Sequence, residues 1–231
     1  AAELEFMAAE AERAGCQVVV GYARNVHPYV LAAVREDEAA KEKEQDVFLY
    51  HSNSFTTEAL PECFQRNSEG MLLNMACHDL CIAVRYFDLK AADCAGAALG
   101  EDPSRSELQV HGGFEDFVRV RFEVPKGGRK LVFQVDRQAG DWVGVQVGQA
   151  GSIHTLPADP VAFEKECAEQ PNVVRYLILQ REAYCCLMST FVRQRMFGED
   201  VQEASGLCGL RDATEVLRIA VELTAKFKVE L

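Results

Sequence analysis

Hydrophobic spacing at the start of the chain predicts a helix followed by a strand. Residues 2–14 place apolar side chains near helical spacing, and Gly15 ends the pattern. The run 16–22, which reads CQVVVGY, is almost continuously apolar and rich in β-branched residues. Such a run is typical of a strand covered on both faces, as in a parallel sheet. We expect the strands that should lie beside it to come from outside this chain.

The next segments alternate between helix and strand. Pro28 can open a helix that runs through about residue 35 into a charged stretch at 36–46, which indicates a solvated helix face. Residues 47–50 predict a strand and residues 57–68 a short helix. Residues 70–87 predict a second helix that is apolar on most of its circumference.

The middle of the chain alternates with period two, and the end is helical again. Residues 117–124 and 131–135 flank a turn at 125–128 and predict an antiparallel hairpin, which 142–147 and 151–156 continue. Long amphipathic patterns cover 173–196 and 210–227. The expected fold is α+β. An open, mostly antiparallel sheet from 47–53 and 91–156 carries helices 57–87 and 173–227 on one face, and the last helix–strand unit of a Rossmann-like domain precedes it.

Composition and charge exclude several classes of protein. The 231 residues carry a formal net charge of -12, which repels nucleic-acid phosphates and anionic lipid, so neither is an expected partner. The longest apolar stretch, 71–87, contains His78, Asp79 and Arg85, so we expect a buried helix that does not span a membrane. The nine cysteines are an odd number without a CxxC motif, which favours free thiols in a reducing compartment, cytoplasm or organelle interior, and no metal site.

The chain lacks the glycine-rich turn that holds a dinucleotide. Gly-Gly occurs at 112–113 and 127–128, but neither pair follows a predicted strand and opens a helix. A complete dinucleotide site therefore cannot be built from this chain alone.

Three local patterns together resemble the Gfo/Idh/MocA family, the group that contains glucose–fructose oxidoreductase and the inositol dehydrogenases. The first is 18–25 with Pro28, which looks like the last strand of the family's nucleotide-binding domain and the crossing into its second domain. The second is 70–79, which looks like the family's helix with an aspartate and, four residues later, a histidine. The third is the tail, similar to the family's closing helices at Arg175, Tyr176, Tyr184, Phe191, Gly206, Gly209, Leu210, Glu215 and Ala220.

The resemblance implies two domains and a cofactor. Residues 1–25 would be the remnant of a nucleotide-binding domain, and 26–231 an α+β substrate and oligomerisation domain. The cofactor implied is NAD or NADP, bound by a half of the protein that this chain does not contain. The family's catalytic lysine would lie just before the first helix, so no residue here stands in for it.

His78 and Asn74 are the candidate catalytic residues. Positions 74 and 78 are one turn apart on a helix and share a face. A histidine whose pKa lies near neutrality suits the removal of a hydroxyl proton during hydride transfer. From spacing alone His78 reads as a satisfied core histidine, whereas the resemblance favours a site-lining role. Asn74 stands where the family usually has aspartate; an asparagine can orient a hydroxyl but cannot accept its proton.

Three residues after the first predicted strand are candidates for substrate binding. Tyr22, Arg24 and Asn25 lie at the carboxyl end of that strand, where open α/β sheets place ligands. The alternative is a solvated loop that crosses between domains. Asp136 and Arg137 end the hairpin and could touch a substrate or partner, although a local salt bridge is the favoured interpretation.

The favoured function is the substrate side of a NAD(P)-dependent oxidoreductase that acts on a sugar or polyol. The alternative is a catalytically inactive member that serves as a structural subunit, which Asn74 favours; a binding module without turnover comes third. The expected partners are an amino-terminal half or another subunit beside residues 1–22, and a further copy across the open sheet face.

Overall fold

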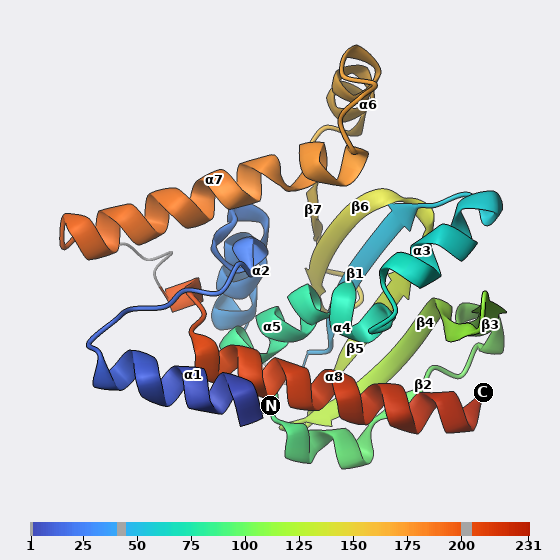
Figure 1. Cartoon of the computed structure of the whole chain (residues 1–231), viewed down its shortest axis with the longest axis horizontal. Helices are drawn as coiled ribbons and strands as arrows, with labels where there is room; N and C mark the ends of the chain where they lie inside the picture. The colour runs from blue at the N-terminus through green and yellow to red at the C-terminus, as the bar shows by residue number, and fades with distance from the viewer. Residues whose placement is uncertain (1, 41–44, 200–204) are drawn as a thin grey trace.

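The computed structural model describes residues 2–40, 45–199 and 205–231, and a seven-stranded sheet organises them (Figure 1). The strand order is β2-β4-β5-β1-β6-β7, and β3 pairs with residues 114–119 of β4. Only the β1–β5 pairing is parallel, which confirms the expected open, mostly antiparallel sheet. The strands are β1 (Val47–Ser54), β2 (Ala98–Leu99), β3 (Glu107–His111), β4 (Phe114–Lys126), β5 (Arg129–Asp136), β6 (Gln138–Val147) and β7 (Ile153–Leu156).

The predicted hairpin is present, with a tighter turn than the expected 125–128. β4 continues to Lys126 and β5 starts at Arg129, so Gly127 and Gly128 alone make the loop. Both glycines have positive φ, +60° and +89°, as a two-residue hairpin turn of the primed type requires. The register sets Phe122 opposite Phe133.

One core joins the inward face of the sheet to helices that include α2, α5 and α8. α2 (Pro28–Ala39) lies against β6 and β7, while α5 (Cys77–Tyr86) packs on α8 (Leu210–Glu230). The rings of Phe122 and Phe133 stack at 4.7 Å, and Phe227 of α8 lies 5.2 Å from Phe122. Figure 1 shows α8 running across the sheet in front of β4 and β5.

The single helix expected over 70–87 is wrong, because the chain forms two short helices. α4 (Met71–Asn74) ends and α5 begins at Cys77. At the junction the amide of Ala76 donates to the carbonyl of Met71, five residues back, at 3.1 Å. The Sγ of Cys77 donates to the carbonyl of Asn74 at 3.3 Å. Residues 74 and 78 are therefore not one regular helical turn apart.

Helix α7 (Arg175–Met196) differs from the expectation that it covers the sheet. It lies mainly against the 3₁₀ turn η1 (Ala23–Val26) and projects beyond the sheet (Figure 1). α6 (Pro160–Glu169) was not predicted, although its signals are readable: Asp159 accepts hydrogen bonds from the amides of Val161 and Ala162, and a proline opens the helix. α3 (Leu60–Arg66) follows the 3₁₀ turn η2 (Thr57–Ala59) and packs on β3 and β4.

The amino-terminal helix is confirmed, and the strand expected after it is not formed. α1 (Ala2–Arg13) lies along α8, where Glu12 pairs with Arg211 at 2.7 Å, and it buries none of its described side chains. Residues 16–22 join no strand among the described residues. The amide of Val20 donates to the carbonyl of Cys208 at 2.8 Å. A strand needs a neighbouring strand, and the described part of the chain places none beside this segment.

Candidate functional site

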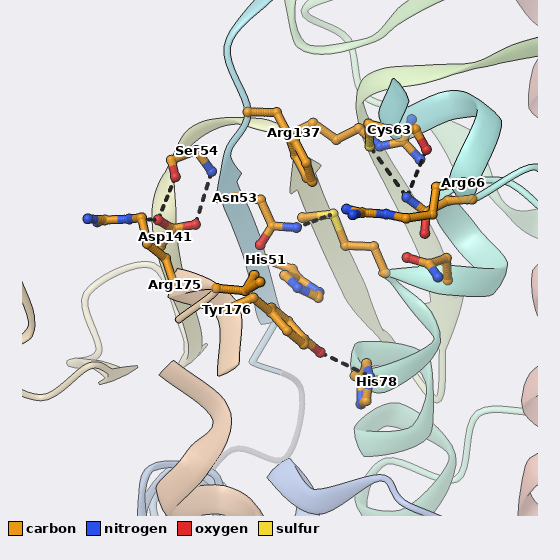
Figure 2. A pocket seen from close by; sticks show the side chains of 15 residues that line it. His51, Asn53, Ser54, Cys63, Arg66, His78, Arg137, Asp141, Arg175 and Tyr176 are labelled. Carbon is orange, nitrogen blue, oxygen red and sulfur yellow. Dashed lines mark hydrogen bonds and ion pairs between the residues drawn. The ribbon is translucent and has the colours of Figure 1, made fainter. Parts of the chain in front are cut away.

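A cleft of about 500 Å³ opens where the end of β1, helices α3 to α5 and the start of α7 meet (Figure 2). Its volume suits a small metabolite. It is lined by His51, Asn53, Ser54, Phe55, Cys63, Arg66, Asn67, Asn74, Met75, His78, Arg137, Asp141, Val174, Arg175 and Tyr176.

His78 lies in this cleft at the amino-terminal end of α5. Its Nε2 is 3.5 Å from the hydroxyl of Tyr176 (Figure 2). Its ring meets the ring of Tyr22 edge-on at 5.7 Å. Its Nδ1 has no hydrogen-bond partner among the described residues. Burial, with the nearby Arg24 and His51, holds the pKa of His78 well below its usual value. The imidazole is therefore neutral near pH 7, which is the state that a general base needs.

Asn74 also lines the cleft, at the end of α4. Its side chain is exposed, and its Nδ2 donates to Oε1 of Glu69 at 2.8 Å. The amide oxygen remains able to accept a hydrogen bond. Asn74 and His78 thus share the cleft although the helix between them is broken.

Arg24 lies behind the cleft, in a buried charged network. Its guanidinium contacts Nε2 of His51 at 2.8 Å and Oδ1 of Asp79 at 3.4 Å, and its Nε donates to Gln180 at 3.3 Å. His51 in turn contacts Asp79 at 2.8 Å. Burial and then Arg24 lower the pKa of His51, against the opposing effect of Asp79. The network holds His51 in the cleft floor, and direct contact of Arg24 with a substrate stays a prediction.

Asn25 and Tyr22 also lie outside the lining of the cleft. The Nδ2 of Asn25 faces the Sγ atoms of Cys208 at 3.1 Å and Cys81 at 3.5 Å, and these two sulfurs are 3.1 Å apart. Tyr22 supports the ring of His78 from the side. The substrate-binding roles of both residues stay predictions, because residues 22–25 fold inward beneath α7 and do not face the cleft.

Several lining residues were not singled out from the sequence. Asp141 accepts hydrogen bonds from the hydroxyl of Ser54 at 2.5 Å and from Nε of Arg175 at 2.6 Å, so it ties α7 to the sheet. Arg175 and Tyr176 entered only through the resemblance of the tail. The readable signal was the polar run 51–54 that ends an apolar strand.

Two further features concern ligands and membranes. Within 2–40, 45–199 and 205–231, no three His, Cys, Asp or Glu side chains gather as a metal ion would require. In the same ranges no helix is both long enough and apolar enough to cross a bilayer.

The comparisons with known proteins place the chain by its fold. No protein-family model matches it, and no curated protein does. Solved structures do match. A Sinorhizobium meliloti protein assigned to the myo-inositol dehydrogenases aligns with a TM-score of 0.65 and 14% identity, over 97% of this chain and 68% of that one.

Other matched structures contain bound NAD. Scyllo-inositol dehydrogenase from Lactobacillus casei, with NAD(H) and scyllo-inositol bound, gives a TM-score of 0.55 and 14% identity over 94% of this chain and 65% of that one. The WlbA dehydrogenase from Thermus thermophilus, with NAD and α-ketoglutarate bound, gives a TM-score of 0.56 and 14% identity over 96% of this chain and 60% of that one. The chain therefore has the fold of part of these dehydrogenases, and it spans 60 to 68% of the lengths of the three proteins.

Proposed function

We propose that this chain is the substrate-side portion of a NAD(P)-dependent oxidoreductase of the Gfo/Idh/MocA family, which acts on a hydroxyl or carbonyl of a sugar or polyol. One observation carries the proposal: a neutral histidine, His78, lines the main cleft of a chain that has the fold of inositol dehydrogenases.

The cleft residues suit the removal of a hydroxyl proton. His78 accepts the proton from the substrate hydroxyl at Nε2, beside the hydroxyl of Tyr176, because its Nδ1 is buried. Asn74 orients the hydroxyl by hydrogen bonding. A bound nicotinamide would supply the acceptor for the hydride of the same carbon. In the reverse direction His78 returns the proton to the nascent alkoxide.

The described part of this chain does not provide the dinucleotide site by itself, because no glycine-rich turn joins a strand to a helix there. We infer that an amino-terminal half, or another subunit, packs beside residues 1–22 and holds the cofactor. Apolar side chains support this inference: Phe6, Met7 and Val18 are 68%, 51% and 40% exposed. Covering such side chains stabilises a protein by about 1.5–3 kcal/mol each when burial is complete.

Substitution of His78 tests the function. In the protein as it occurs in the cell, His78→Ala should lower kcat/KM for polyol oxidation by roughly 10²–10⁴-fold, the usual effect of losing a general base. The matched control is His154→Ala, since His154 of β7 pairs with Glu36 of α2 and lies outside the cleft lining. If His78→Ala retains turnover within a few-fold of the unsubstituted protein, the assigned role is wrong.

A further inference from the structure

One wall of the cleft carries two arginines that the proposed proton transfer does not use. Figure 2 shows Arg66 and Arg137 near Cys63, away from the side that carries Asp141 and Arg175. Both arginines line the cleft.

Arg66 is only weakly ion-paired. It lies in the last turn of α3, and its side chain is 61% exposed. Its ion-pair partner is Glu62, one turn back at 3.9 Å and 81% exposed. An exposed pair of this kind contributes little to stability. The guanidinium is therefore free to bind a ligand in the cleft.

Arg137 adds a second positive charge inside the wall. Its side chain is 2% exposed, its Nη2 donates to Oδ2 of Asp116 at 2.7 Å, and its guanidinium lies 4.8 Å from the ring centre of Phe64. Its Nη1 has no partner among the described residues. Leaving a buried donor unpaired is unfavourable, so a ligand that accepts its hydrogen bond gains affinity. Asp116 is shared with the amide of Met71, at 3.0 Å, so its charge is divided between two donors.

The arginines of the cleft differ in how firmly carboxylates pair them. Arg175 is bound by Asp141 and Glu164, and Arg137 is bound by Asp116. Arg66 has only the exposed Glu62 at 3.9 Å, so it is the arginine of the three that is most available to a ligand.

We propose that the cleft takes an anionic sugar or polyol derivative, whose carboxylate or phosphate binds Arg66 beside the buried Arg137 while its hydroxyl-bearing carbon faces His78. This inference rests on the proposed function for the reacting end of the ligand. The anion end follows from the two arginines alone, because guanidinium groups bind carboxylates and phosphates through two parallel hydrogen bonds.

Calorimetric titration of the complete protein tests the inference without turnover. The probes are D-glucuronate, D-glucose 6-phosphate, inorganic phosphate and D-glucose. At least one anionic sugar should bind about tenfold or more tightly than glucose. Arg66→Gln should weaken that binding about 10- to 100-fold, as expected for a hydrogen bond to a charged group. Arg66→Lys should retain part of it, since lysine keeps the charge without the planar fork.

The control variant is Arg105→Gln. Arg105 is 53% exposed, pairs with Asp102 within one turn at 3.4 Å and lies outside the cleft lining, so its loss should leave binding unchanged. The inference is overturned if glucose binds as tightly as both anionic sugars, if the preference survives Arg66→Gln, or if no probe binds. The difference in affinity between glucuronate and glucose 6-phosphate shows whether the cleft prefers a carboxylate or a phosphate.

The two proposals fail separately. A protein that prefers anions through Arg66 but transfers no hydride keeps this inference and loses the oxidoreductase function. A protein that oxidises polyols but binds anionic sugars equally well with Arg66→Gln keeps the function and loses the anion subsite.

Discussion

Three histidines make the stability of the folded protein depend on pH. His27, His51 and His78 all have pKa values below the usual 6.5, and burial is the largest cause in each case. Each is neutral in the folded protein at a pH where the unfolded chain binds a proton. The unfolded state therefore takes up more protons as pH falls, and the folded state loses stability.

We expect the free energy of unfolding to fall as pH drops from 6.5 toward 5, by roughly 1 kcal/mol per pH unit for each histidine that stays neutral. Urea unfolding at several pH values measures this. His78→Gln should flatten the dependence, because glutamine does not titrate there. A free energy that rises over the same interval would contradict the burial of these side chains in neutral form.

At the residue scale, spacing alone favoured a core histidine at position 78, and the family resemblance singled out His78 and Asn74. Both side chains line the cleft, and their catalytic roles stay predictions. Arg24 was not recognised as a buried residue, because charged side chains are rarely buried unless paired. Its partners His51 and Asp79 are 27 and 55 residues away, and no local pattern reports a contact of that separation.

At the scale of elements, alternation and turn chemistry predicted the sheet well. The apolar pattern over 70–87 did not predict where that helix breaks. Strands β4 and β5 follow from strict alternation and from Gly127–Gly128. The break between α4 and α5 has no glycine or proline to indicate it, since it arises from the hydrogen bond of Ala76 to Met71. Helix α7 contacts η1, which lies far away in the sequence, so its position depends on tertiary packing that no local pattern reports.

The contact of α8 with the sheet gives a stability prediction. Phe227→Ala should lower the free energy of unfolding by about 3–5 kcal/mol, because it removes a fully buried ring beside Phe122 and leaves a cavity. Val229→Ala, on the same helix and 88% exposed, should change it by less than about 0.5 kcal/mol. Equal effects in chemical denaturation would show that α8 does not pack on the sheet.

At the scale of the whole molecule, the sheet face opposite the core is the expected surface for self-association. Phe48 stacks on Tyr50 with ring centres 6.5 Å apart, Trp142 lies 5.4 Å from Tyr50, and all three side chains are half-buried. We propose that a second copy covers this face. Trp142→Arg should shift the protein to monomer in sedimentation experiments, whereas Val161→Arg, on exposed α6, should not. An unsubstituted protein that is monomeric at micromolar concentration would contradict the proposal.

Hydride transfer from a polyol tests the central claim most directly. The complete protein is incubated with NAD or NADP and a set of sugars and polyols deuterated at their hydroxyl-bearing carbons, and the mass of the reduced nucleotide is measured. The account predicts a reduced nicotinamide that carries deuterium, and its loss in His78→Ala. A protein that binds the nucleotide but never gains deuterium from any of these compounds would contradict the account.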